Sequence, residues 1–152
     1  MSDLQHSTLQ FERNINATPD HLFNCLTQGD KRQIWNSPGE GQVVIIDTPI
    51  PATPGVRETS RVGPAENPYA TVHADWIILT PGERVVYAET IAAEGMDLGV
   101  TLVVCEITPR DSGCQLSIHL QLTSFVGEEF STQVGAGWTH AVDALVKFVD
   151  AA

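Results

Sequence analysis

Apolar and polar side chains alternate along residues 7–16, so that Phe11 and Ile15 fall on one face and Glu12 and Asn14 on the other. This period of two predicts a strand with one buried face.

Helical spacing replaces the alternation after Thr18. A hydroxyl residue followed by Pro19 is typical of a helix start, because the hydroxyl caps the first turn and proline already has a helical φ angle. We expect this helix to end at Gly29. A second short helix, in DKRQIWNSP, is expected to stop at Pro38.

The region from Gly41 to Phe125 is predicted to form strands. The predicted segments are 41–48, 55–63, 71–80, 84–92, 99–108 and 114–125. Segment 55–63 is polar and is therefore expected at a sheet edge, while Trp76 and Ile78 are expected on the inner face. Apolar residues alternate with polar ones throughout the last segment, which is typical of an antiparallel sheet with one solvated face.

A final helix is expected over residues 129–150. Its apolar residues recur at steps of three and four, and additional valines make the apolar face wide. Such a helix needs a broad concave surface, which a curved sheet offers. The sequence therefore predicts one α+β domain, residues 1–152, with a curved antiparallel sheet, two short helices and a long C-terminal helix.

Three motifs occur in order along the chain. A segment of the form A-x-P-x-x-V-F-x-A-L-T, followed by a Trp, is matched at Ala17, Pro19, Leu22, Phe23, Leu26, Thr27 and Trp35. A segment P-x-x-R-h-V-Y, with h apolar, is matched at Pro81, Arg84, Val85, Val86 and Tyr87. A closing G-W…L…L pattern is met by Gly137, Trp138, Val142 and Leu145.

With these motifs the sequence resembles the START-like superfamily (SRPBCC, the helix-grip fold). Within it, the sequence is similar to homologues of the Aha-type activator of the heat shock protein 90 ATPase. Asn36 stands where such segments often carry a second Trp. The resemblance implies a helix-grip fold and a cavity, because a strongly curved sheet and a straight helix cannot touch along their full length. The fold alone does not assign a function.

Charge narrows the range of partners. The net charge is −11 with only eight Lys plus Arg, which are scattered, so we expect no nucleic-acid partner. No run approaches the roughly 18 apolar residues of a membrane helix, so we expect no membrane insertion. The first residues carry no secretory signal, and a cytoplasmic location is the expectation.

The sequence contains no local motif for metal or cofactor binding. Cys25, Cys105 and Cys114 form no CxxC pair and are expected to be reduced core thiols. The five histidines lack the spacing of a metal site. We therefore predict no metal, no cofactor and no catalytic residue.

The candidate cavity lining combines residues assigned to inward faces of well-separated segments. The predicted lining residues are Phe23, Trp35, Trp76, Tyr87, Ile118, Leu120 and Leu145. Strand parity adds Arg13 and Glu89 as candidate polar contacts. Plain core packing is the alternative for each aromatic residue.

The leading function hypothesis is binding of a small hydrophobic or amphipathic molecule in this cavity. Two alternatives stay open. One is a protein-interaction module of the chaperone co-factor type, which the family resemblance suggests. The other is an enzyme of the polyketide cyclase or dehydrase kind, which needs an acid–base residue facing the cavity.

Overall fold

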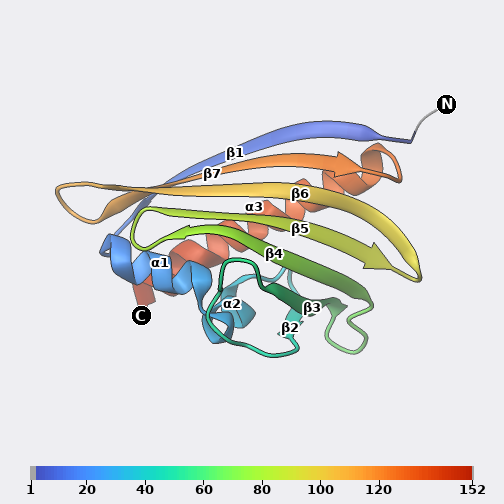
Figure 1. Cartoon of the computed structure of the whole chain (residues 1–152), viewed down its shortest axis with the longest axis horizontal. Coiled ribbons are helices and arrows are strands. Elements are labelled where there is room, and N and C mark those ends of the chain that lie inside the picture. Colours follow the sequence, from blue (N-terminus) through green and yellow to red (C-terminus); the bar gives the residue numbers. More distant parts are fainter. Residues whose placement is uncertain (1–2, 152) are drawn as a thin grey trace.

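Seven antiparallel strands form one curved sheet in the order β1-β7-β6-β5-β4-β3-β2 (Figure 1). The structure is a computed structural model that describes residues 3–151. The strands are β1 Gln5–Ile15, β2 Gln42–Ile46, β3 Arg57–Pro64, β4 Ala70–Thr80, β5 Arg84–Ala93, β6 Met96–Pro109 and β7 Cys114–Ser124. The helices are α1 Pro19–Thr27, α2 Gly29–Trp35 and α3 Glu128–Ala151. The predicted helix-grip α+β fold is confirmed.

The two short helices follow each other directly. The Thr18 hydroxyl accepts a hydrogen bond from the His21 backbone N–H at 3.1 Å, so the predicted cap forms. Gly29 does not end α1 as a left-handed cap; it is the first residue of α2. A Cβ atom there would lie 2.9 Å from the Pro49 Cα. Close packing of the chain, and not helix capping, therefore explains this glycine.

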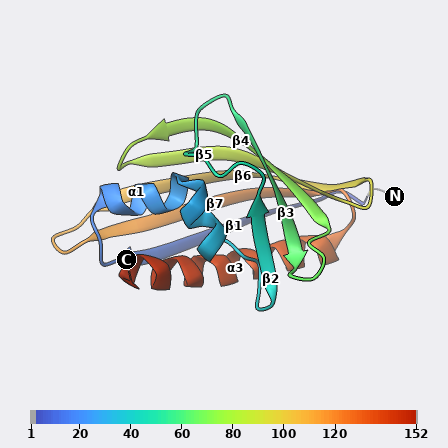
Figure 2. The same ribbon diagram turned by 90° about the horizontal axis from the view of Figure 1, so that it is seen from below.

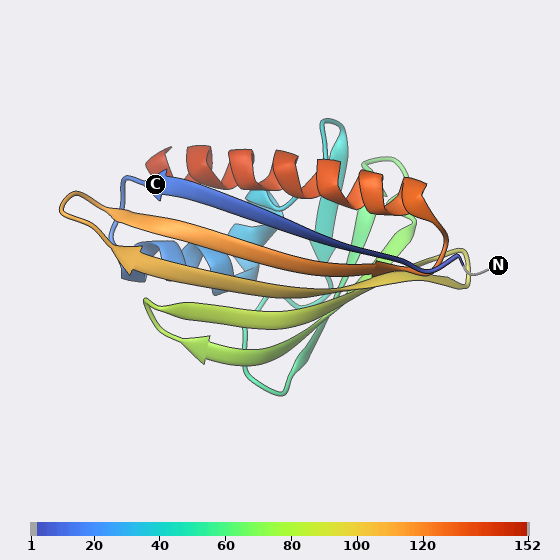
Figure 3. The same cartoon turned by 90° about the horizontal axis from the view of Figure 1, so that it is seen from above.

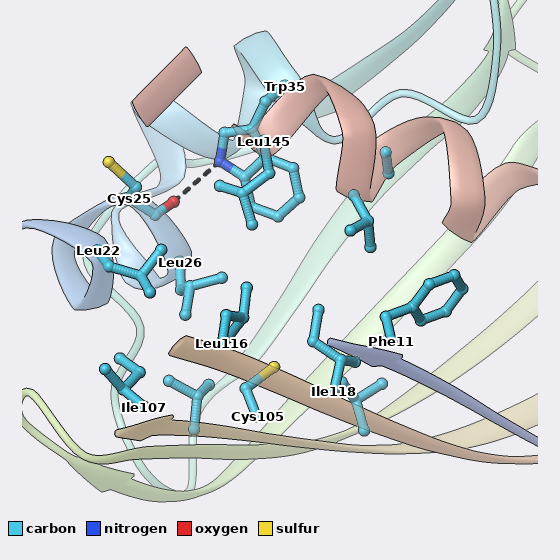
Figure 4. Packing of buried hydrophobic residues seen from close by; sticks show 14 of the residues in the cluster. Phe11, Leu22, Cys25, Leu26, Trp35, Cys105, Ile107, Leu116, Ile118 and Leu145 are labelled. Carbon is cyan, nitrogen blue, oxygen red and sulfur yellow. Dashed lines mark hydrogen bonds between the residues drawn. The ribbon is translucent and has the colours of Figure 1, made fainter. Parts of the chain in front are cut away.

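Helix α3 packs on β1 and β7, at one side of the curved sheet (Figures 2 and 3). Leu145 of α3 is fully buried, and Leu116 and Ile118 of β7 are almost so. The Trp35 indole N–H donates to the Cys25 carbonyl at 2.9 Å, which ties α2 to α1 above this core (Figure 4). The side of the sheet formed by β1, β7 and β6 is thus filled with close-packed side chains.

The expected edge strand is an interior strand. Strand β3 lies between β4 and β2, and the sheet edges are β1 and β2. The polarity of β3 has another cause, because Glu58 and Ser60 face the inside of the molecule.

A bulge changes the expected orientation of one residue on β4. The pairing of β4 with β5 shifts between Trp76 and Ile78. An extra residue at a bulge reverses the alternation of faces beyond it. Trp76 is therefore buried as predicted, whereas Ile78 is 45% exposed and not on the inner face.

None of the helices among residues 3–151 is both long enough and apolar enough to cross a membrane.

We predict that Leu145→Ala lowers the free energy of unfolding by about 3 kcal/mol, because a fully buried leucine leaves a void among close-packed neighbours. Urea unfolding followed by circular dichroism measures this loss. Ile34→Ala is the control: Ile34 is 69% exposed, and its truncation should change stability by less than about 0.5 kcal/mol. Equal effects of the two substitutions would contradict the assignment of the core.

Candidate ligand-binding cavity

A cavity lies on the side of the sheet that α3 does not fill. Its volume is about 200 Å³. It is lined by side chains of α2, of residues 130–141 of α3 and of strands β2 to β5. The apolar part of the lining consists of Pro38, Val44, Ile46, Val62, Val72, Ala74, Ile91, Phe130, Val134, Gly137, Trp138 and Ala141.

Small residues keep this space open. Ala74 lines it from the sheet, and Gly137 and Ala141 line it from α3. Asn36, at the position where related segments often carry a second Trp, also lines it. A large apolar side chain at any of these positions would occupy volume that the cavity now contains.

One part of the lining is polar and holds a buried ion pair. Two nitrogens of the Arg32 guanidinium donate to the two Glu58 carboxylate oxygens, at 2.6 and 2.5 Å. The two side chains are only 6% and 10% exposed. A bidentate pair in this environment is strong but costly to desolvate, and it fixes the position of both groups.

Trp76 supports this ion pair. The Arg32 guanidinium carbon lies 4.8 Å from the centre of the Trp76 ring, which is a cation–π contact. The Tyr87 ring packs against Trp76 with ring centres 4.6 Å apart. The aromatic pair and Glu58 together hold Arg32 in one place.

Glu89 adds a second carboxyl to the polar part of the cavity. Its side chain is half-buried, and it lines the cavity. Burial raises the pKa of Glu89 from 4.5 to about 7; the Arg32 guanidinium opposes this shift, and the Glu58 carboxylate adds to it. Near neutral pH this carboxyl is therefore present in both its neutral and its charged form.

Tyr87 contributes a neutral hydroxyl. Burial, helped by the nearby Glu89 carboxylate, raises the pKa of Tyr87 well above its usual value of 10. The structure gives the Tyr87 hydroxyl and the Glu89 carboxyl no hydrogen bond to any residue of the described range 3–151. Both residues line the cavity, so their polar groups are available to a bound molecule.

The predicted cavity residues separate into two groups. Tyr87 and Glu89 line the cavity. The remaining aromatic and aliphatic candidates belong to the packed core or contact it: Phe23, Trp35, Trp76, Ile118, Leu120 and Leu145. Arg13 lies on β1, where its side chain is 34% exposed and 3.5 Å from the Asp143 carboxylate. The ligand-binding role of all these residues stays a prediction.

Sequence reasoning missed Arg32, Glu58 and Ser60. Two signals were present. Glu58, Ser60 and Val62 alternate along β3, which marks one face of that strand. Arg32 on α2 lies four residues before Asn36, the residue that follows this helix. A charged residue on an inward face is unusual enough to suggest a site.

No group of three metal-ligating side chains comes together among residues 3–151. The three cysteines are free and buried, and burial raises the pKa of the Cys105 thiol to about 12. Their thiols are therefore protonated and unreactive at neutral pH.

Comparisons with solved structures support the fold. The Mll3558 protein from Rhizobium loti superposes with a TM-score of 0.82 at 23% identity, covering 95% of this chain and 98% of that one. An uncharacterized protein from Rhizobium leguminosarum superposes with a TM-score of 0.81 at 18% identity, covering 98% of this chain and 97% of that one. Protein Ms6760 from Mycobacterium smegmatis superposes with a TM-score of 0.72 at 16% identity, covering 99% of this chain and 94% of that one. At these identities the likeness concerns the fold alone. No family model and no curated protein matches the chain.

We predict that Glu89 makes the protein less stable as the pH rises. The folded state keeps the Glu89 proton up to a pKa of about 7, whereas the unfolded chain loses it near 4.5. Between these values the folded state binds more protons, so the free energy of unfolding falls with rising pH and levels off above about 7. Glu89→Gln removes this pH-dependent contribution to stability. Urea unfolding should show that the free energy of unfolding of the variant, relative to that of the wild type, rises by about 2 to 3 kcal/mol between about pH 5 and about pH 8.

Glu58→Gln is the matched comparison, because it changes the other carboxyl of the cavity. It leaves the Arg32 guanidinium without its anionic partner and should destabilise the protein by about 3 to 5 kcal/mol at neutral pH. Parallel pH profiles of wild type and Glu89→Gln would contradict the raised pKa of Glu89.

Proposed function

We propose that the protein binds a small hydrophobic or amphipathic molecule in the cavity between the curved sheet and α3. The helix-grip fold supports this proposal, since such a fold suits a ligand-binding domain. Ligand sites in proteins are concave, mostly apolar and supplied with a few polar groups that orient the ligand. The cavity described above has this composition.

One observation carries the proposal. The cavity walls are mainly aliphatic and aromatic, yet the Tyr87 hydroxyl and the Glu89 carboxyl beside them have no protein partner within the described residues. These oxygens are open to the cavity, since neither is among the fully buried polar atoms without a partner, and a molecule that displaces water from the cavity has to bind them to avoid a desolvation cost. An amphipathic ligand would cover the apolar walls and bind these two groups at the same time.

The order of the three sequence motifs supports membership in the family of Aha-type activator homologues, which we propose on that ground. The proposed ligand site depends on the cavity of this chain and not on the family name. A cytoplasmic location stays a prediction of the sequence.

A second candidate is an enzyme of the polyketide cyclase or dehydrase kind. The observation that favours it is Glu89, because a carboxyl with a pKa of about 7 can both accept and donate a proton at neutral pH. Native mass spectrometry separates the two candidates. A binding protein returns the supplied molecule unchanged, whereas an enzyme of this kind releases either a cyclised isomer of equal mass, which chromatography resolves, or a product that is lighter by one water.

We predict saturable binding of the apolar fluorescent probe N-phenyl-1-naphthylamine. The probe should increase in fluorescence and raise the melting temperature, because a ligand that binds only the folded state stabilises it. Ala141→Leu places three more carbon atoms at the cavity wall and should weaken binding at least about tenfold, while circular dichroism shows an unchanged fold.

Ala136→Leu is the control, because Ala136 is exposed on the same helix and does not line the cavity. It should bind the probe as the wild type does. If both variants bind equally well, the probe occupies another surface, and the proposed site is wrong. Ala74→Val serves as a second filling variant, should Ala141→Leu not fold.

A further inference from the structure

The polar part of the cavity has more negative than positive groups. Arg32, Glu58 and Glu89 line it together, and Arg32 is the only cationic residue among the lining residues that the structure describes. Both Glu58 oxygens already accept hydrogen bonds from the guanidinium. One positive charge therefore faces two carboxyl groups, and among residues 3–151 Glu89 has no ionic partner of its own.

The sheet register fixes the position of Glu89 relative to this ion pair. Ala74 pairs with Glu58 on one side and with Glu89 on the other. Because neighbouring strands are spaced by nearly 5 Å, the Cα atoms of the two glutamates lie about 10 Å apart, with only the small Ala74 between them. The two carboxyl groups thus enter the cavity from the same row of the sheet.

Arg32 cannot easily turn to a bound anion. Its guanidinium is held by two hydrogen bonds to Glu58 and rests on the Trp76 ring at 4.8 Å. One Arg32 donor, the Nε–H group, is buried and has no partner among residues 3–151. A ligand carboxylate that reached this donor would still lie close to the carboxyl groups of Glu58 and Glu89, and their negative charge disfavours an anionic head group.

Glu89 and Tyr87 offer free acceptor oxygens to a ligand. They are two residues apart on β5, so their Cα atoms lie about 7 Å apart along the same face. The Tyr87 residue is only 9% exposed, and its hydroxyl has no partner within residues 3–151. A carboxylate is acceptor-only, and a phenol oxygen can also accept, whereas an ammonium group has three donors and no acceptor.

The other elements around Glu89 bring no further charge. Opposite it stand Ala74 on β4 and Thr101 on β6, and both are neutral. The α3 residues that line the cavity, such as Gln133 and Trp138, are neutral as well. Burial, the Arg32 guanidinium and the Glu58 carboxylate are thus the causes that set the pKa of Glu89.

We propose that the cavity selects apolar amines over fatty acids, with the ligand ammonium bound by the Glu89 carboxylate and the Tyr87 oxygen. The hydrocarbon part of the ligand lies along the aliphatic walls of β3 to β5, at residues such as Val62, Val72 and Ile91. This inference rests on the proposed function and specifies the ligand class of the same site.

The experiment compares three ligands that share one hydrocarbon chain: n-octylamine, 1-octanol and octanoate. Isothermal titration calorimetry at about pH 8 and physiological salt should give the tightest binding for the amine and the weakest for octanoate, separated by at least about tenfold. Glu89→Gln should weaken amine binding at least about tenfold relative to the wild type, whereas its affinity for 1-octanol should stay within about threefold of the wild-type value.

Two control variants exclude general attraction of the amine to an acidic protein. Glu66→Gln removes an exposed carboxylate outside the cavity and should bind all three ligands as the wild type does. Ala141→Leu should weaken binding of all three. Amine binding that survives Ala141→Leu would place the amine on the surface and overturn the inference.

The wild-type protein provides a test that needs no variant. Ammonium binding selects the charged form of Glu89, so amine affinity should rise by about tenfold between about pH 6 and about pH 8. A flat profile overturns the inference. If octanoate binds as tightly as octylamine while 1-octanol also binds, the amine preference is wrong and the ligand-binding function stands. If none of the three binds, both proposals fail.

Discussion

A straight helix cannot remain in contact with a strongly curved sheet across its whole width, and the structure follows from this constraint. Helix α3 packs on β1 and β7, where side chains such as Leu145 and Ile118 are buried in one hydrophobic cluster. The strands that curl away, β3 to β5, lie beyond its reach, and α2 comes in from the other side. The space between α2 and α3 stays open because the facing positions carry Ala74, Gly137 and Ala141. The cavity is thus a property of both backbone geometry and residue size.

The ion pair of Arg32 and Glu58 is a consequence of the same geometry. The strands β3 to β5 have an inner face that no other layer fully covers, so charged side chains there can keep access to the cavity while losing contact with bulk water. Replacing such a pair with apolar residues often stabilises a protein, so its presence is weak support for a structural role. Its fixed position on Trp76 agrees with the role that we propose for it, the orientation of the polar part of a ligand site.

The sequence predicted the fold well and the site in part, for physical reasons. Helix and strand periods come from local geometry, so the seven strands, the Thr18 cap and the long apolar helix could be read from spacing alone. Strand parity also placed Tyr87 and Glu89 on the cavity side. Parity failed at Ile78, where a bulge inserts one residue. Trp35 and Leu145 were equally apolar candidates, but which inward positions fill space and which border it depends on the curvature of the sheet, which no local pattern encodes.

The polar strand β3 shows how a strand that faces a cavity can be mistaken for an exposed edge. Its residues are polar because they alternate between solvent and the cavity, not because the strand lacks a neighbour. Glu58 and Ser60 weaken the hydrophobic pattern that would otherwise identify an interior strand. Cavity-facing positions depart from the pattern of a stable core, since a carboxylate such as that of Glu89 lowers stability when it is held in a buried environment. A polar strand inside an otherwise regular alternating sheet is therefore a reason to look for a cavity beside it.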